Sequence, residues 1–504
     1  MHSTAETLLY RNQFILGPSF IHQFESWKKL TFGKSLNLTV HPALNVSQAT
    51  HGQISIRLLG FIIDPEFPDA TDSEILDTLA RSYSTFDDLL ERTGNLGGRW
   101  VLIVDDSHVI RLFNDATGLR QVFFSVPDLT NDRWCASQPG LIGKVLKLGM
   151  DEGAVEFIRW AQARGRDFRW PGDSSPYKEI KHLMPNCYLD LENGTTGRFW
   201  PKKGLDKLTL GEAGEKISPV LSGLMRGASN RFDLAVALSA GWDSRLMLAA
   251  CKEIAHKLTF MTVKRVGMSD QDADIKTTVR LASKLGLKHD IIEVSPDLKK
   301  EFLDSFEKNV SFPHLAKNAA PLQAQLNHYR LRKVMVVGNV SEVARRFYKL
   351  KAGEEIAASK LAALSGLEHP FAKPFIEHWL SSLGETYNIN VLDLLYWEQK
   401  CANWLAMDHL EYDIAWRDIF TPYNTRSLLL DMLSVDEKFR SPPRFMLYEG
   451  LIRAMWPDVL SEPIHSPRYQ RNLTYYARSA RQYAGRLKRK VLSLVKQDRR
   501  ESSV

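Results

Sequence analysis

Apolar residues along the chain follow two different patterns, and the change between them falls near residue 205. Before that point, short runs rich in β-branched and aromatic residues predict β-strands. Asn193-Gly194 predicts a hairpin turn between the last two runs. The strands are expected at 54–63, 99–104, 108–113, 187–191 and 196–200, and helices near 73–92 and 151–163. The N-terminal part is therefore expected to be rich in β-structure.

From about residue 206, short apolar strands alternate with amphipathic helices. Strands are expected at 234–238, 258–263, 289–294 and 333–337, and helices at 245–256 and 273–285. The apolar face of the second helix is expected to hold Ile275, Val279, Ala282 and Leu285. This alternation predicts a doubly wound parallel sheet, whose ligands bind at the carboxyl ends of the strands. Beyond residue 390 the pattern is mainly helical.

The composition adds the class of protein. A length of 504 residues favours two domains, and 44% hydrophobic with 25% charged residues is typical of a soluble globular chain. No apolar run reaches the roughly 18 residues that a membrane span needs, and the N-terminus lacks the layout of a secretion signal. The cysteines and histidines are dispersed, which argues against a disulfide framework or a zinc site. We therefore expect a cytoplasmic protein with reduced thiols.

The net charge of +7 is concentrated at the C-terminal end. Residues 468–500 contain eleven Lys or Arg residues and one acid, so the rest of the chain is slightly acidic. Apolar residues recur in this segment at helical spacing, which predicts a basic amphipathic tail over 468–504. Such a helix suits an anionic membrane surface, although a helix of this kind more often packs on its own protein. No specific nucleic-acid partner is expected.

A loop that could bind phosphate follows the first strand of the C-terminal part. Its sequence is Ser239-Ala-Gly-Trp-Asp-Ser244. Small residues between a strand and a helix expose backbone N–H groups at the positive end of the helix dipole, and Ser239 and Ser244 add hydroxyl groups. Asp243 would be repelled by phosphate unless a cation lay between them, which suggests Mg²⁺. The alternative is an ordinary turn in which Asp243 and Ser244 only cap the helix.

A second loop follows the strand that ends at Val337. It runs Gly338-Asn-Val-Ser-Glu342 and is expected to face the first loop across the point where the strand order reverses. Glu342 would then lie near Asp243, and two carboxylates with phosphate oxygens between them make a plausible magnesium site. The alternative is that Glu342, Arg345 and Arg346 form a solvated helix face.

These motifs together resemble the asparagine synthetase family. The loop 239–244 is similar to the SGGxDS loop of ATP pyrophosphatases, with Ala240 in place of the first glycine. The N-terminal part resembles the amidotransferase half of the same family, and the order and spacing match over about 100–460. The segments that carry this second resemblance begin at Gly98, Asn114, Cys135 and His182, followed by Phe199-Trp200.

The resemblance implies a fold and a division into domains. It implies an Ntn-like β-rich sandwich over 1–205, related to glutaminases, and an ATP-pyrophosphatase domain over 206–467. The second domain is expected to hold a doubly wound parallel sheet and a helical C-terminal part. The nucleophile of the family's glutaminase is an N-terminal cysteine, whereas this chain begins Met1-His2-Ser3. Glutamine hydrolysis is therefore not expected, and the first domain is expected to serve as a scaffold.

The resemblance also assigns roles to individual residues. Asp243 and Glu342 would hold Mg²⁺, and Asp418 and Tyr348 would act in catalysis. The residues expected to bind ATP are Ser239, Gly241, Asp243, Ser244, Val263 and Gly338. The family's late lysine would fall near His465, where no lysine stands. Lys264, Arg265 or Arg345 could supply a positive charge instead.

The function implied is an ATP-dependent, AMP-forming ligase. It would adenylate a carboxylate of a small molecule or peptide, release pyrophosphate, and transfer the acyl group to ammonia or an amine of the substrate. Two alternatives stay open. The chain could be a non-catalytic relative that binds nucleotide as a sensor or scaffold, which Ala240 and the missing lysine favour. It could also be a protein that binds nucleic acid or a membrane surface through its basic tail.

Overall fold

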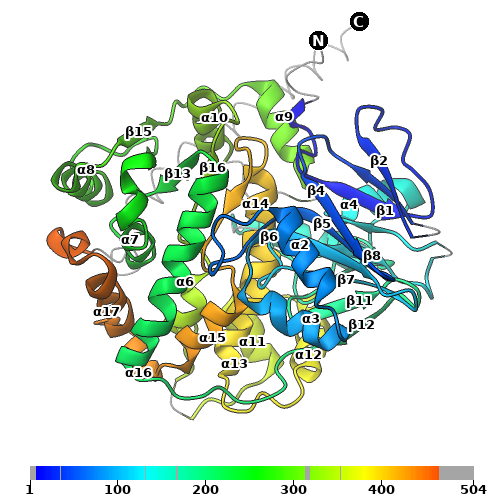
Figure 1. The fold of residues 1–504 in the computed structure, drawn as a ribbon. Helices are drawn as coiled ribbons and strands as arrows, with labels where there is room; N and C mark the ends of the chain where they lie inside the picture. The colour runs from blue at the N-terminus through cyan, green and yellow to red at the C-terminus, as the bar shows by residue number, and fades with distance from the viewer. Residues whose placement is uncertain are drawn as a thin grey trace, which may run out of the picture.

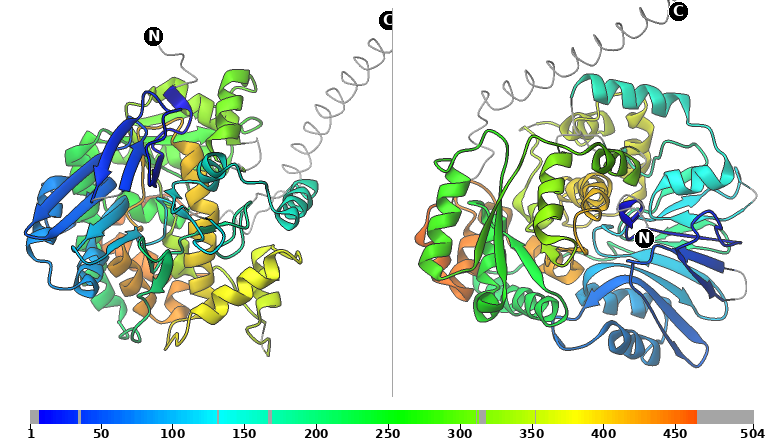
Figure 2. Two further views of the ribbon diagram at one scale, coloured as in Figure 1. Left: turned by 90° about the vertical axis from the view of Figure 1, so that its right-hand side faces the viewer. Right: turned by 90° about the horizontal axis from the view of Figure 1, so that it is seen from above.

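The computed structural model describes residues 7–33, 36–130, 132–165, 169–310, 312, 318–351 and 353–464. Strands of the N-terminal part and helices of the C-terminal part lie side by side over a broad contact (Figures 1 and 2). Ser3, His465 and the basic tail over 468–504 lie outside the described residues. Among the described residues, no helix combines the length and the apolar character that crossing a bilayer requires.

Two antiparallel sheets of six strands each form the N-terminal part. The first has the order β10 (Ile180–His182), β8 (Phe123–Ser125), β9 (Cys135–Ala136), β1 (Phe14–Gly17), β3 (Leu36–Val40) and β2 (Lys28–Phe32). The second has the order β12 (Thr195–Arg198), β11 (Cys187–Asp190), β7 (Ile110–Asn114), β6 (Gly97–Asp105), β5 (Ile54–Ile63) and β4 (Val46–His51). The prediction of a β-rich sandwich is confirmed.

The alternation of side chains along β6 explains how the sandwich is layered. Val101 and Ile103 enter the core between the two sheets, whereas Trp100 and Leu102 point to the other side. That outer face is covered by α2 (Asp72–Arg81) and α3 (Phe86–Arg92), while α4 (Pro139–Leu146) covers the outer face of the first sheet. Because both faces of β6 are buried, its sequence is a continuous apolar run.

A parallel sheet of five strands organises the C-terminal part. Its order is β15 (His289–Glu293), β14 (Thr259–Lys264), β13 (Leu234–Ala237), β16 (Val334–Val336) and β17 (Ile419–Phe420). Leu234 and Val236 pack with α6 (Leu210–Arg231) on one face, and Ala235 packs with α9 (Lys300–Asn309) and α10 (Ala319–Tyr329) on the other. The sheet is therefore doubly wound, as predicted, and its strand order reverses between β13 and β16.

Helices make up most of the remaining chain. The longer ones are α5 (Glu152–Ala163), α7 (Trp242–Ala249), α8 (Ala273–Leu285), α11 (Ala358–Ser365), α12 (Ala372–Ser382), α14 (Ala406–Tyr412), α15 (Arg426–Ser434) and α17 (Met446–Met455). The short helical segments are η1 (Thr93–Asn95), η2 (Lys252–Lys257), η4 (Ser341–Arg345), α13 (Val391–Leu394), α16 (Glu437–Arg440) and η6 (Pro457–Ser461). A π-helical segment, η5 (Leu395–Leu405), connects α13 to α14.

Two details of the helix predictions are wrong. The helix expected at 245–256 begins earlier and is divided into α7 and the 3-10 turn η2. In α8, whose bounds match the prediction, Val279 is 44% exposed, and the buried side is centred on Thr278 and Leu281. Helical spacing alone could not separate these two faces, because both contain residues three and four positions apart.

The two halves share one hydrophobic core and are joined by buried polar contacts. Glu398 of η5 is fully buried and accepts two hydrogen bonds from Arg198, at 2.7 and 2.9 Å, and one each from Asn186 and Trp379, at 2.8 Å. The same core cluster contains Phe61 and Leu119 of the first half and most of the buried residues of the second. The N-terminal half therefore packs as a structural partner of the C-terminal half.

His182 lies at this contact and should make the protein sensitive to acid. Its ring stacks on Phe123 with the centroids 4.5 Å apart, and Nδ1 lies 2.9 Å from the side-chain oxygen of Asn403. Burial lowers the pKa of His182 to about 4. The unfolded state therefore takes up a proton near pH 6.5, whereas the folded state does so only near pH 4. The stability that His182 contributes is present above pH 6.5 and is lost as the pH falls toward 4.

The variant His182→Gln should consequently lose part of this pH dependence. Between pH 7 and pH 5 the free energy of unfolding should fall by about 2 kcal/mol more in the wild type than in the variant. The comparison between variant and wild type is needed because burial raises the pKa of Asp393 to about 6, which acts in the opposite direction over the same range. Urea titrations of both proteins at the two pH values measure this difference. If the free energy of unfolding falls by the same amount between pH 7 and pH 5 in both proteins, the role of His182 is contradicted.

Candidate functional site

The two predicted loops meet where the strand order reverses. Strand β13 leads through residues 238–241 into α7, and its neighbour β16 leads through residues 337–340 into η4. A Cβ atom added to Gly338 would lie 3.0 Å from the carbonyl carbon of Asp243 and 3.1 Å from the amide nitrogen of Ser244. Gly338 thus lets the second loop approach the first so closely that a side chain here would require the neighbouring backbone to shift by a few tenths of an ångström.

Hydroxyl groups hold the first loop in shape. The Oγ atoms of Ser239 and Ser244 lie 2.8 Å apart. Ser244 accepts a hydrogen bond from the backbone N–H of Ser239 at 3.1 Å, and Ser239 accepts one from that of Gly241 at 3.2 Å. The N–H of Ala240 donates to the carboxylate of Asp274 at 2.9 Å. The loop therefore already binds one carboxylate oxygen, as an anion-binding loop would.

The N-terminus of α7 continues this polar surface. Gly241 is the N-cap, with no side-chain hydrogen bond, and α7 begins at Trp242. The N–H groups of the first turn have no acceptor within the helix, and they lie at the positive end of its dipole. Together with the two serine hydroxyls, they suit phosphate oxygens. The first loop and the first turn of α7 are therefore where the structure can hold an anion.

Asp243 and Glu342 do meet in space, and Arg345 joins them. The Nη2 atom of Arg345 lies 2.7 Å from Oδ2 of Asp243 and 3.3 Å from Oε1 of Glu342. Ser341 donates a hydrogen bond to the other oxygen of Asp243. Burial raises the pKa of Asp243 to about 6, against the opposing effect of Arg345. Because Glu342 and Arg345 point into this cluster, they do not form the solvated face considered above; Arg346 pairs with Glu437 instead.

This arrangement does not fit the expected magnesium ion. Mg²⁺ requires oxygen ligands at about 2.0–2.1 Å in octahedral geometry. The oxygens of Asp243 and Glu342 that would bind it are in contact with the guanidinium group of Arg345. Among the residues that the structure describes, no group of three or more His, Cys, Asp or Glu side chains is placed to hold a metal ion. No chemical step is therefore assigned to a metal here.

The structure also shows the surroundings of three other predicted residues, Val263, Lys264 and Tyr348. Val263 and Lys264 end β14, and Lys264 is paired with Asp270 at 2.8 Å and Glu293 at 3.0 Å. Tyr348 is buried, and its ring packs against Phe347 with a centroid distance of 4.8 Å. The structure thus gives Tyr348 a packing role, and of the three candidate cations it brings Arg345 to the carboxylates.

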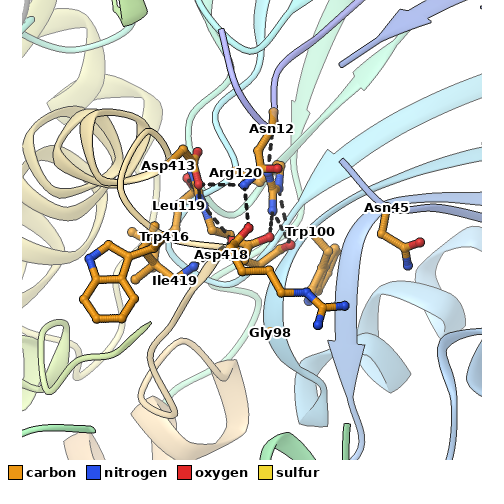
Figure 3. Close-up of polar contacts among 12 residues, drawn as sticks. Asn12, Asn45, Gly98, Trp100, Leu119, Arg120, Asp413, Trp416, Asp418 and Ile419 are labelled. Carbon is orange, nitrogen blue, oxygen red and sulfur yellow. Dashed lines mark hydrogen bonds and ion pairs between the residues drawn. The ribbon is translucent and has the colours of Figure 1, made fainter. Parts of the chain in front are cut away.

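Asp418 is placed where the predicted catalytic role is not supported. It immediately precedes β17, at the amino end of the parallel sheet, whereas the two loops lie at the carboxyl end. Its two oxygens accept hydrogen bonds from Arg99 at 3.1 Å and from Arg120 at 2.9 Å (Figure 3). The contacts of Asp418 therefore join the two halves of the chain at the opposite end of the sheet from the two loops, and its catalytic role stays a prediction. The motif resemblance located the segment but carried no information about which end of the strand the carboxylate occupies.

Several residues of the site were not predicted from the sequence. Tyr423 donates to the backbone oxygen of Asp243 at 3.0 Å, and Tyr448 donates to that of Ser341 at 2.7 Å. Arg245 is fully buried and donates to the backbone oxygen of Val459 at 2.6 Å, which fastens η6 behind the loop. These contacts join segments about 100–200 positions apart in sequence, so no local motif could have indicated them.

Cys135, the first cysteine of the chain, does not offer a reactive thiol. Cys135 is buried in β9, and burial raises the pKa of its thiol to about 12, which keeps it protonated and unreactive. The segment 59–63 is part of β5 and pairs with β6 along its length. Ser3 lies outside the described residues.

Comparisons with known proteins give no family assignment. No family model matches the chain, and no curated protein does so either. The glutamine-dependent NAD+ synthetase from Acinetobacter baumannii, solved in complex with ADP, is 15% identical over 39% of this chain and 43% of its own, with a TM-score of 0.20. The NH3-dependent NAD synthetase from Campylobacter jejuni, in complex with nitrate, is 19% identical over 35% of this chain and 83% of its own, with a TM-score of 0.20.

A third solved structure covers more of the chain. The glutamine phosphoribosylpyrophosphate amidotransferase from B. subtilis, complexed with ADP and GMP, is 10% identical over 79% of this chain and 92% of its own, with a TM-score of 0.24. This chain therefore spans less than half of the A. baumannii synthetase and most of the other two proteins. Structural similarity at TM-scores this low gives no information about the activity of this chain. The function is therefore inferred from the geometry of the site alone.

Proposed function

We propose that this chain is an ATP-dependent, amide-forming ligase that works without hydrolysing glutamine. The observation that carries the proposal is the meeting of two loops at the point where the strand order reverses. One loop ends in the N-terminus of α7 with the hydroxyls of Ser239 and Ser244, and the other brings the charged cluster of Glu342 and Arg345 against it. In doubly wound sheets this is where nucleotides bind.

The proposed reaction has two steps. An oxygen of the substrate carboxylate attacks the α-phosphorus of ATP, the bond from that phosphorus to pyrophosphate breaks, and an acyl-adenylate forms. The leaving pyrophosphate carries the new negative charge, which the first turn of α7 and the two serine hydroxyls are suited to stabilise. An amine then attacks the acyl carbon, loses a proton, and expels AMP. The amine would be ammonia or a group of the substrate, because burial raises the thiol pKa of each described cysteine and keeps it protonated.

Binding of ATP should depend on the two serine hydroxyls. The double variant Ser239→Ala/Ser244→Ala should bind ATP about 100-fold or more weakly, because hydrogen bonds to charged groups contribute about 1.5–3 kcal/mol each and two of them are lost. Titration calorimetry of ATP, with and without MgCl₂, measures this effect. Ser229→Ala, a change on α6 whose hydroxyl only bonds the backbone oxygen of Arg226, serves as the matched control. An unchanged affinity in a folded double variant would contradict the proposed site.

A second candidate function is favoured by one specific feature of the site. Arg345 occupies the place between the carboxylates, and the N–H of Ala240 is already used by Asp274. Both features suit a non-catalytic relative that binds nucleotide as a sensor or scaffold. Exchange of labelled pyrophosphate into ATP, measured with a panel of carboxylic acids, separates the two. Exchange supports the ligase, whereas tight ATP binding without exchange for any acid supports the sensor.

A further inference from the structure

The cation that a phosphate site needs is already present in this chain as a side chain. Arg345 lies at the end of η4, and its side chain is 15% exposed. One of its nitrogens contacts both Asp243 and Glu342. On the other side, the guanidinium carbon lies 5.9 Å from the ring centroids of Phe445 and Tyr448. The guanidinium group is therefore held between two carboxylates and an aromatic wall.

A divalent ion would have to compete with this group. An ion that binds the same oxygen of Asp243 would lie within a few ångströms of the guanidinium group, where two positive charges repel strongly. Moving Arg345 away would break both ion pairs and remove the side chain from Phe445 and Tyr448. The site thus has a fixed cation in place of an exchangeable one.

The same side chain keeps donors for a ligand. Among the described residues, Nε of Arg345 has no hydrogen-bond partner, and the second oxygen of Glu342 has none either. The guanidinium group presents a planar fork of donors that suits phosphate. The contact with Asp243, a residue in the first turn of α7, places the guanidinium group of Arg345 near the N-terminus of that helix. A phosphate group at that helix terminus would therefore lie near the guanidinium group of Arg345.

We propose that Arg345 is the resident cation of this site, and that the chain binds pyrophosphate groups there without a divalent metal ion. The inference rests on the proposed function for the position of the phosphates. It differs from the proposed function in one respect: Mg²⁺ was the expected cofactor, whereas here the guanidinium group of Arg345 takes its place. The position of Arg345 relative to Asp243 and Glu342 is the observation that supports it.

The first test measures metal binding in the absence of nucleotide. Mn²⁺ is titrated into the protein, and free Mn²⁺ is followed by electron paramagnetic resonance. The wild type should bind no Mn²⁺ that depends on Asp243, whereas Arg345→Gln should gain such a site because both carboxylates are freed. Arg346→Gln, the neighbouring arginine that pairs with Glu437, should gain none, and Glu342→Gln added to Arg345→Gln should remove the gain. Mn²⁺ binding to the wild type that Asp243→Asn abolishes would overturn the inference.

The second test uses inorganic pyrophosphate as the probe. The wild type should bind it in EDTA, and Arg345→Gln should bind it about tenfold or more weakly under the same conditions, through loss of hydrogen bonds to a charged group. Arg345→Lys, which keeps the charge, provides a folded comparison if the glutamine variant is unstable, and it should retain part of the affinity. Pyrophosphate binding to the wild type only when Mg²⁺ is present would overturn the inference while leaving the proposed function intact.

Failure of the proposed function has a different signature. If the wild type binds neither pyrophosphate nor ATP in any buffer, the loop is not a phosphate site. The statement that pyrophosphate binds there without a metal ion is then wrong. The Mn²⁺ titration still tests whether Arg345 takes the place of a metal ion, because the gain of a metal site in Arg345→Gln does not depend on any nucleotide. Metal-free pyrophosphate binding without exchange into ATP supports the inference and favours the sensor over the ligase.

Discussion

Replacing Arg99 with methionine is expected to lower the free energy of unfolding by about 3–5 kcal/mol. Arg99 is 1% exposed and donates to both oxygens of Asp413, at 2.7 and 2.9 Å, and to Asp418 at 3.1 Å. Removing it leaves the buried carboxylate of Asp413 without its main partner. Burial already raises the pKa of Asp413 against the effect of Arg99, so the variant should also unfold more readily as the pH rises.

Urea unfolding at pH 7, followed by tryptophan fluorescence, measures this loss. Arg92→Met is the matched control, because the pair of Arg92 with Asp88 is on the surface, where such pairs contribute at most about 1 kcal/mol. The double variant Arg99→Met/Asp413→Asn should recover part of the stability, since it removes the carboxylate left unpaired. A single variant as stable as the control would show that the buried pair does not hold the halves together.

Replacing Gly60 with alanine is expected to cost at least about 3 kcal/mol, through backbone strain and overpacking combined. Gly60 has a φ angle of +112°, a conformation that residues with a side chain rarely adopt. An added Cβ would lie 2.1 Å from the backbone oxygen of Arg99 and 3.1 Å from Nε of Arg120. The substitution would therefore push β5 away from β6 and displace the arginine that binds Asp418.

Gly52→Ala provides the matched comparison for Gly60→Ala. Gly52 also has a positive φ angle, of +58°, but nothing lies within 4 Å of an added Cβ. It should cost only the strain of a left-handed residue, about 1–2 kcal/mol. Thermal unfolding of the two variants separates strain from overpacking. If both variants lose the same stability, the close approach at Gly60 has no energetic consequence.

Both predictions concern the contact between the halves, which also suggests what the N-terminal half does. Asp115 accepts hydrogen bonds from the backbone N–H groups of Trp100, Leu119 and Arg120, at 2.8–3.1 Å. It thereby shapes the turn that carries Arg120 to Asp418. The segment beginning at Asn114, which was matched to the amidotransferase half, therefore has a structural use in this chain. This is consistent with the expected scaffold role of the N-terminal half.

The local sequence was sufficient to predict five strands of the second antiparallel sheet, four strands of the parallel sheet and the two loops, whereas the first antiparallel sheet was not predicted. Runs of β-branched and aromatic residues located those strands, and their alternation with helices of period 3.6 indicated the doubly wound sheet. The loops at 239–244 and 338–342 were found because small residues at the end of a parallel strand are distinctive in sequence. On α8, Ile275 and Ala282 are buried as predicted, whereas Val279 is exposed, since helical spacing does not fix which of two overlapping faces meets the sheet.

Only the tertiary structure determined which charged side chains pair with one another. Asp243 and Glu342 lie on adjacent strand ends, so their proximity followed from topology, but the guanidinium of Arg345 between them depends on the path of η4 after Gly338. Likewise, the sequence could not show that Asp418 stands at the amino end of β17, paired with arginines about 300 residues earlier. Motifs record which residue types are near each other along the chain. The partner that neutralises a buried charge is chosen by packing between distant segments, and it is this packing that separates a metal site from an ion pair.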